Sequence, residues 1–212
     1  TTGLTALQAM QIGTAGLTAM LCVMALEEAG ITPEQGDILV TGASGGVGSV
    51  AVSLLAAKGY SVIAATGRES NRELLLQLGA KQVITRDELL TPIRALDKQL
   101  WAGAVDTVGS SVLAKILSQM NYGGAVAACG LAGGFDLPAT VMPFILRNVR
   151  LQGVDSVMCP FERRQQAWQQ LAQLLPASFY DHACEEIILE EAPEAAAKIM
   201  DGQITGRVVI KI

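Results

Sequence analysis

A short apolar run, a glycine-rich stretch and a second apolar run constrain this chain more than any other feature. Residues 38–41 are mostly β-branched, residues 40–48 read VTGASGGVG, and Val47 to Lys58 has the composition of an apolar helix. In a strand, turn and helix of this kind, Gly45 would let the backbone approach a diphosphate and Gly48 would allow close packing of helix on strand. The alternative is a tight turn without a ligand. We predict a dinucleotide site here.

Strands and helices alternate over most of the chain. Further strands are predicted at 60–66, 82–85, 104–108, 125–128 and 151–157, and helices at 87–100 and 111–121. Ser70 and Glu73 form a capping-box pattern for another helix that ends at Gly79. Such alternation predicts an α/β fold, a Rossmann-type doubly wound parallel sheet. After Cys159 the pattern changes to polar helices at 162–175 and 190–200 and a final strand at 206–212 without a βαβ partner.

The residues after the second strand indicate which dinucleotide binds. An acidic residue usually holds the ribose hydroxyls of NAD at this place, and here the chain reads Thr66-Gly67-Arg68. An arginine can pair with a 2′-phosphate, so NADPH is favoured. Glu69 could be the missing acid, but it lies beyond the strand. Arg86, after the third strand, either reaches the same phosphate or is an ordinary exposed arginine.

Composition excludes several classes of function. The net charge is −5 and no block of basic residues is present, so a nucleic-acid partner is not expected. The four cysteines are far apart and His182 is the only histidine, which argues against a zinc site and favours a reduced, cytoplasmic setting. Residues 1–26 carry no charge, a length that could cross a bilayer, but polar residues interrupt them and no basic residue flanks them. A helix buried against the sheet is the preferred interpretation, with no membrane partner.

The glycine spacing also matches short-chain dehydrogenases, whose chemistry needs a lysine four residues after a tyrosine. Residues 64, 126 and 184, four places after the three tyrosines, are alanine, valine and cysteine. This family is therefore not supported.

The chain resembles the cofactor domain of the medium-chain dehydrogenase/reductase superfamily, in its zinc-free, quinone-oxidoreductase-like branch, and most of all the bacterial NADPH-dependent acrylyl-CoA reductases. The segments that carry the resemblance are GTAGLTAML at 13–21, VTGASGGVG at 40–48, DTVG at 106–109, MNYGG at 120–124, CGLAGGF at 129–135 and MPFILRNVRLQGVDS at 142–156.

The resemblance implies a set of cofactor contacts. Ser44, Gly45, Gly46 and Val47 would hold the diphosphate; Thr66, Gly67, Arg68 and Arg86 would hold the adenosine phosphate; and Leu131, Ile145 and Ser156 would line the nicotinamide side. Leu131 and Ile145 could equally be plain core, and Asp106 is more often a helix cap or structural residue than a catalyst. No catalytic residue and no metal ligand is predicted in the chain.

The resemblance also implies an organisation and an activity. Residues 1–159 would form the NADP-binding domain, and residues 160–212 a tail that returns to a GroES-like substrate domain absent from this sequence. We therefore expect a piece of a longer homodimeric protein, inactive alone, that reduces the C=C bond of an enoyl-CoA such as acryloyl-CoA with NADPH. A quinone reductase and a non-catalytic NADPH-binding module are the alternatives. The predicted edge strand at 151–157 would pair the two sheets of the dimer.

Overall fold

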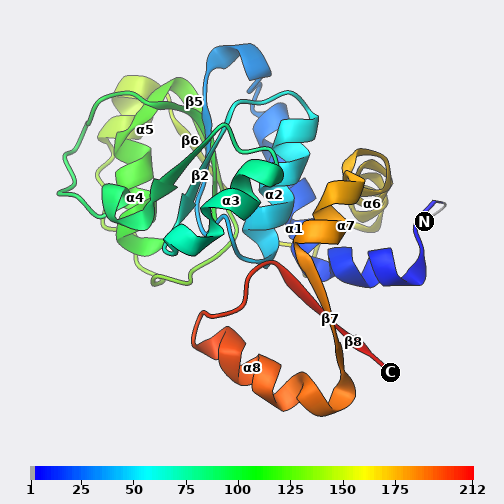
Figure 1. Ribbon diagram of the computed structural model, residues 1–212. Helices are drawn as coiled ribbons and strands as arrows, with labels where there is room; N and C mark the ends of the chain where they lie inside the picture. Colours follow the sequence, from blue (N-terminus) through cyan, green and yellow to red (C-terminus); the bar gives the residue numbers. More distant parts are fainter. Residues whose placement is uncertain (1–2) are drawn as a thin grey trace.

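The main body of the protein is a six-stranded parallel sheet with the order β3-β2-β1-β4-β5-β6 (Figure 1). The structure is a computed structural model and describes residues 3–212. The strands are β1 (Ile38–Val40), β2 (Val62–Thr66), β3 (Gln82–Thr85), β4 (Trp101–Asp106), β5 (Met120–Ala128) and β6 (Arg150–Gly153). This order confirms the predicted Rossmann-type doubly wound sheet.

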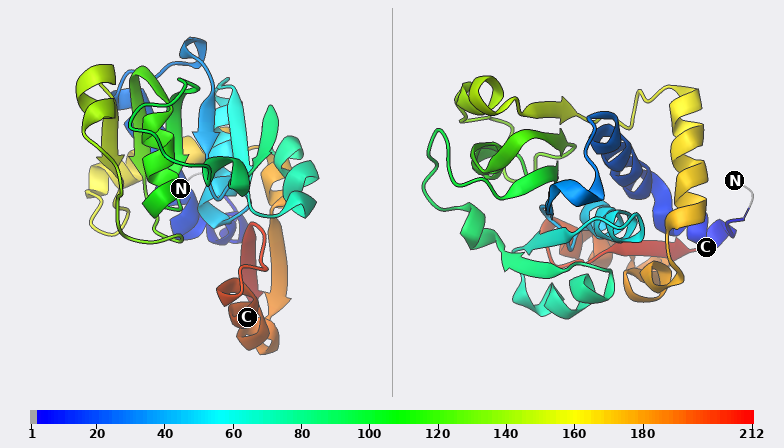
Figure 2. Two further views of the ribbon diagram at one scale, coloured as in Figure 1. Left: turned by 90° about the vertical axis from the view of Figure 1, so that its left-hand side faces the viewer. Right: turned by 90° about the horizontal axis from the view of Figure 1, so that it is seen from above.

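Helices cover both faces of the sheet, so the central strands are apolar on both sides and fully buried. The first core cluster joins the sheet to α1 (Ala6–Glu28), α2 (Gly46–Ala57) and α3 (Arg72–Gln77), and it continues into α6 (Phe161–Leu174) and α7 (Ala177–His182). The second cluster joins the opposite face to α4 (Ser110–Ser118) and α5 (Met142–Arg147). Figure 2 shows the three layers from two further directions.

Helix α1 is long and apolar enough, by length and composition, to span a membrane. Most of it is buried, because it packs against α2, α6 and β5. Gly13, with φ +50°, interrupts its helical backbone near the start. The preferred interpretation, a helix buried in the core, is confirmed.

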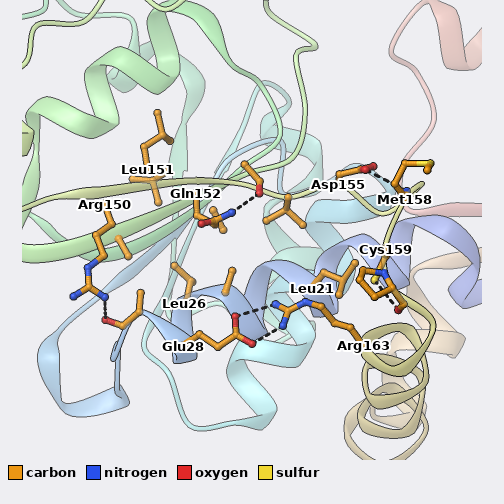
Figure 3. Close-up of a pocket in the computed structure, with 18 residues that line it drawn as sticks. Leu21, Leu26, Glu28, Arg150, Leu151, Gln152, Asp155, Met158, Cys159 and Arg163 are labelled. Carbon is orange, nitrogen blue, oxygen red and sulfur yellow. Dashed lines mark hydrogen bonds and ion pairs between the residues drawn. The ribbon is translucent and has the colours of Figure 1, made fainter.

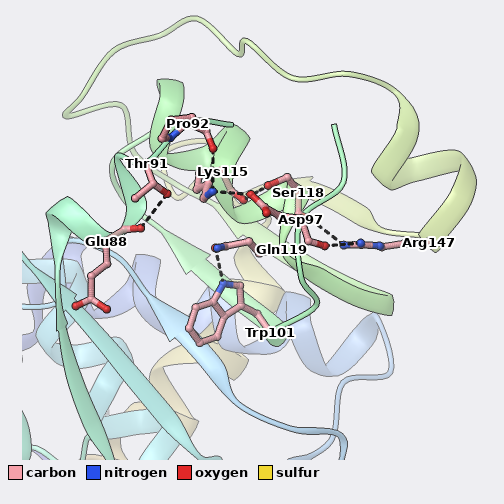
Figure 4. Close-up of polar contacts among 9 residues, drawn as sticks. All are labelled: Glu88, Thr91, Pro92, Asp97, Trp101, Lys115, Ser118, Gln119 and Arg147. Atoms are coloured by element: carbon pink, nitrogen blue, oxygen red, sulfur yellow. Dashed lines mark hydrogen bonds and ion pairs between the residues drawn. The ribbon is translucent and has the colours of Figure 1, made fainter. Parts of the chain in front are cut away.

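The helix predicted at 87–100 is wrong. Only a 3-10 turn (Arg86–Leu89) forms, and residues 90–100 follow an irregular path. Proline at 92 disfavours helical backbone at Thr91, so the turn cannot extend into a longer helix. Polar contacts then fix the segment (Figure 4): the buried Lys115 ammonium donates to Asp97 Oδ2 at 2.6 Å and to the Pro92 carbonyl at 3.1 Å. Arg147, at the end of α5, donates to the carbonyls of 97, 118 and 120.

Two other local predictions also differ from the structure. Ser70 caps no helix, because Glu69–Asn71 is a 3-10 turn and α3 begins only at Arg72, after Asn71. The last strand of the sheet, expected over 151–157, is β6, which covers only Arg150–Gly153. Beyond it, the Asp155 carboxylate accepts from the backbone N–H groups of Val157 and Met158 and turns the chain away from the sheet.

The tail contains a second, smaller unit that stands apart from the sheet in Figure 1. Strands β7 (Cys184–Ile188) and β8 (Arg207–Lys211) pair in parallel, and α8 (Ala192–Met200) connects them. The final strand therefore does have a βαβ partner, contrary to prediction, because β7 precedes it. Helices α6 and α7, by contrast, contribute Leu171 and Phe179 to the core of the main body. A domain boundary after Cys159 stays a prediction.

Candidate cofactor-binding site

The order of the strands creates a crevice at the carboxyl ends of β1 and β4. The chain leaves β1 for α2 on one face and leaves β4 for α4 on the other, so the two connections diverge from neighbouring strands. Ligands of doubly wound sheets bind at this switch point. The predicted glycine loop, residues 42–48, lies at this edge.

The glycine loop is packed too tightly for side chains at two positions. Gly42 has φ +56°, and a Cβ there would stand 2.2 Å from Thr107 Oγ1. A Cβ at Gly48 would stand 2.3 Å from the Gly42 carbonyl oxygen, so α2 can start against the loop only with glycine at 48. No side chain caps α2, and the N–H groups of its first turn have no acceptor within the helix. The loop that holds Ser44, Gly45, Gly46 and Val47 thus suits an anion such as a diphosphate.

Asp106 fixes the other side of the crevice. Its buried carboxylate accepts from Thr41 Oγ1 at 2.6 Å and from the backbone N–H of Gly109 at 2.8 Å. Burial raises the pKa of Asp106, while the hydrogen bond from Thr41 opposes the shift. Thr107 also donates to Thr41, through its backbone N–H and its hydroxyl. Asp106 therefore holds the ends of β1 and β4 together, the structural role that sequence favoured.

The residues predicted for the adenosine end lie together at the ends of β2 and β3. Ser44 Oγ and Thr66 Oγ1 are 3.1 Å apart, and the backbone N–H of Arg68 donates to Thr66 Oγ1 at 3.2 Å. The Arg86 guanidinium lies over Gly67, with Cζ 3.5 Å from where a Cβ of that glycine would be. Glu69 is paired with Arg72 and belongs to an exposed ion pair.

The guanidinium of Arg68 has an unexpected set of partners. Its Nη1 donates to the Gln203 carbonyl at 2.7 Å and its Nη2 to the Ile204 carbonyl at 2.8 Å. The segment after α8 therefore crosses the end of β2.

Arg207 is a site residue that the sequence reasoning missed. It begins β8, yet its Nη1 lies 3.0 Å from the position of a Cβ on Gly46, the first residue of α2. Its Nε donates to the Gln11 carbonyl at 2.9 Å, and within residues 3–212 no carboxylate pairs with it. Burial lowers the pKa of Arg207. A half-buried cation at the positive end of a helix repels that end, unless an anion lies between them.

Of the three residues predicted for the nicotinamide side of the site, only two lie at the carboxyl edge of the sheet. Leu131 follows β5, with its Cα 3.3 Å from where a Cβ of Gly109 would be, and it is exposed rather than core. Ser156 follows β6 at the same edge of the sheet, because the pairing of β5 with β6 ends at Val154. Ile145 is not brought to this edge. It lies on α5, whose Pro143 lines a small cavity together with Ser118, at the amino end of β5.

A separate groove of about 530 Å³ runs beside the edge strand β6, between α1 and α6 (Figure 3). Its charged groups have partners within the chain: Arg163 forms a two-point ion pair with Glu28, and Arg150 donates to the Ala29 carbonyl at 2.9 Å. It is distinct from the crevice at the glycine loop.

A zinc site is not formed by the described part of the chain. Within residues 3–212, no three His, Cys, Asp or Glu side chains gather where they could hold a metal ion. The four cysteines in this range are free thiols.

Comparison with known proteins decides the family. The sequence model of the zinc-binding dehydrogenase family matches residues 46–176, more than half of the chain. The chain belongs to this family. The matched residues include the start of α2, strand β4 of the two crevice-forming strands, and the edge strand β6, whereas β1 precedes them.

Individual dehydrogenase-family relatives are closely similar. The probable acrylyl-CoA reductase AcuI of Escherichia coli is 66% identical over 99% of this chain, and the acrylyl-CoA reductase AcuI of Ruegeria pomeroyi is 51% identical over 99%. A candidate quinone oxidoreductase of Bacillus subtilis, YhfP, is 48% identical over 97%. The chain spans 64%, 64% and 63% of these relatives, respectively. The crystal structure of E. coli YhdH with bound NADPH matches all of this chain, and 65% of its own, with a TM-score of 0.97 and 65% identity.

Proposed function

We propose that this chain is the NADPH-binding part of a reductase that acts on the C=C bond of an α,β-unsaturated acyl-CoA such as acryloyl-CoA. The observation that carries the proposal is the pairing of an uncapped helix start in the glycine loop with Arg207. An anion placed there would bind the N–H groups and the guanidinium together. The similarity to two acrylyl-CoA reductases supports the substrate class.

The residues of the chain would bind and orient the cofactor. The loop from Ser44 to Val47, with Arg207, would hold the diphosphate, and Gly67 with Arg86 would receive the adenosine 2′-phosphate near the charge of Arg68. Leu131 and Ser156 would border the nicotinamide. When bound, NADPH supplies the hydride for the β-carbon of the thioester. The chain's part in the reaction is to fix the position of that donor against the acyl group.

The test is NADPH oxidation with acryloyl-CoA, measured on the chain alone and on the chain joined to the substrate domain expected before it. We expect NADPH binding in both proteins and turnover only in the joined one. Binding without turnover in the joined protein would contradict the reductase proposal and favour a non-catalytic module.

Quinone reduction is the second candidate, because the B. subtilis relative at 48% identity is named for it. The same assay with a simple quinone separates the two. A higher kcat/KM for the quinone than for acryloyl-CoA would overturn the enoyl-CoA assignment.

We also infer a cytoplasmic homodimer. Among the strands of residues 3–212, β6 pairs with β5 alone and leaves its other edge open, so two copies could join their sheets there. The groove beside β6 would then be covered by the second copy.

A further inference from the structure

Two thiols from distant parts of the chain meet behind the crevice. Cys22 lies on α1 and is fully buried, whereas Cys129 directly follows β5 and is half-buried. Helix α1 packs against β5, and a hydrogen bond joins the two thiols. The other two free thiols, Cys159 and Cys184, lie just before α6 and at the start of β7. Cys22 and Cys129 are therefore close enough to act together.

Cys129 is held against Asp106, the residue whose carboxylate fixes the crevice. The backbone N–H of Cys129 donates to the Asp106 carbonyl at 2.9 Å, and its thiol donates to the same oxygen at 3.5 Å. The Cys129 sulfur is thus left as the acceptor for the Cys22 thiol. A covalent bond at Cys129 would act on the segment that leads to Leu131.

The hydrogen bond between the thiols makes them chemically unequal. It lowers the pKa of Cys129, although burial and the charge of Asp106 oppose this shift. The same hydrogen bond raises the pKa of Cys22 well above the usual value for a thiol, and burial adds to the rise. Because the thiolate is the reactive form, Cys129 is the thiol that reacts first, with Cys22 protonated beside it.

From this arrangement we propose that Cys22 and Cys129 form a redox-active dithiol, a modification site that a hydroperoxide converts to an intramolecular disulfide. With hydrogen peroxide, the Cys129 thiolate attacks one oxygen and breaks the O–O bond, which leaves a sulfenic acid on Cys129 and, after protonation, one molecule of water. The Cys22 sulfur then attacks the Cys129 sulfur, and its proton leaves with the sulfenic hydroxyl as a second water. The thiols lose two electrons in total, and one peroxide is reduced to two waters.

The disulfide would join α1 to the segment after β5, on the side of that segment away from the bulk solvent. Its formation requires no dinucleotide. The proposal is therefore independent of the proposed function, and the two fail separately.

The test treats the unmodified chain with hydrogen peroxide, alkylates the remaining thiols in denaturant and identifies linked peptides by mass spectrometry. We expect the loss of two of the four thiols, a mass lower by two hydrogen atoms, and a cross-link between the peptides of Cys22 and Cys129. Dithiothreitol should restore all four thiols. Four thiols that stay open to alkylation, or over-oxidation of Cys129 while Cys22 remains free, would overturn the proposal.

A double variant, Cys159→Ser with Cys184→Ser, is the matched control, because it keeps the thiol pair intact. It should form the same cross-link at an unchanged rate, and failure to do so would contradict the assignment. Cys22→Ala should leave a sulfenic acid on Cys129 that dimedone captures, without a disulfide. Should Cys22→Ala not fold, the cross-link in the control variant decides the question alone.

The relative rates of the half-buried thiols give a second readout in the unmodified chain. Burial raises the pKa of Cys184 to about 11. Cys184 should therefore react with peroxide at least about tenfold more slowly than Cys129. Equal rates at the two cysteines would show that the contact with Cys22 does not activate Cys129.

Discussion

At the scale of single residues, glycines set the shape of the cofactor loop. We predict that Gly48→Ala destabilises the protein by about 1–3 kcal/mol, because its methyl group would press on the Gly42 carbonyl. NADPH affinity should fall with it, since the first turn of α2 would shift. Gly153→Ala is the control, because a Cβ at this position meets nothing within 4 Å. The free energy of unfolding of this variant should stay within about 0.5 kcal/mol of that of the unmodified protein. Equal unfolding midpoints for the two variants in urea would contradict the account of the loop.

Arg207 gives a second prediction at this scale. Arg207→Gln should weaken NADPH and NADH alike, by about tenfold or more, because the diphosphate is common to both. In the absence of a dinucleotide, its Tm should change little, because relief of the repulsion at the helix start offsets the lost hydrogen bond to the Gln11 carbonyl. Lys211→Gln, on the same strand and exposed, is the control. A lower Tm with unchanged affinity would mean that Arg207 serves only packing.

The sequence predicted some of these residues and not others for a physical reason. The glycine loop and Thr66 to Arg68 follow strands directly, so local pattern places them at the sheet edge. Arg207 reaches the site through a contact with Gln11, 196 residues away in the chain, and no local pattern reports it. The partners of Arg68 were hidden in the same way, because they are the carbonyls of Gln203 and Ile204, which are distant in the chain.

At the scale of elements, the clearest case is the irregular segment 90–100. Side-chain contacts, and not backbone pairing, fix the position of this segment. We predict that Lys115→Met lowers Tm more than Lys81→Met, because Lys115 is buried whereas the Lys81 pair with Asp37 is exposed. Thermal unfolding monitored by circular dichroism checks this. Equal Tm values for the two variants would show that the Lys115 contacts do not stabilise the segment.

The same pair predicts a pH dependence. The hydrogen bond from Lys115 lowers the pKa of Asp97, so the folded state favours the ionised carboxylate. Its stabilising contribution is therefore present above the unfolded pKa of about 4 and is lost as the pH falls through the lower, folded value. In Lys115→Met this part of the acid dependence should disappear, giving a shallower loss of stability below about pH 4. An unchanged slope would contradict the assignment of the shift to Lys115.

Helix and strand predictions succeeded where buried apolar residues mark the element, as Ala167 and Leu171 do in α6 and residues 83–84 do in β3. The predicted helix at 162–175 is α6, and the predicted strand at 82–85 is β3. The prediction at 87–100 was wrong because its contacts with Lys115 and Arg147 are tertiary. The unpredicted β7 has only half-buried and exposed residues, so no apolar alternation marks it.

At the scale of the whole molecule, the open edge at β6 predicts association. Light scattering at micromolar concentrations should give the mass of two chains. Gln152 lies on this edge and is exposed, so a two-fold axis through β6 would bring the two copies of it close together. Gln152→Glu should weaken the dimer through like-charge repulsion, and Gln77→Glu on α3 should not. A monomer in the unmodified protein would contradict the joined-sheet arrangement.

The most direct test of the account is a titration of the unmodified chain with NADPH and NADH, followed by nicotinamide fluorescence. A crevice with a diphosphate loop and the Arg86 guanidinium beside Gly67 predicts that NADPH binds about ten- to a hundredfold more tightly. Equal binding of the two dinucleotides, or tighter binding of NADH, would contradict the central claim.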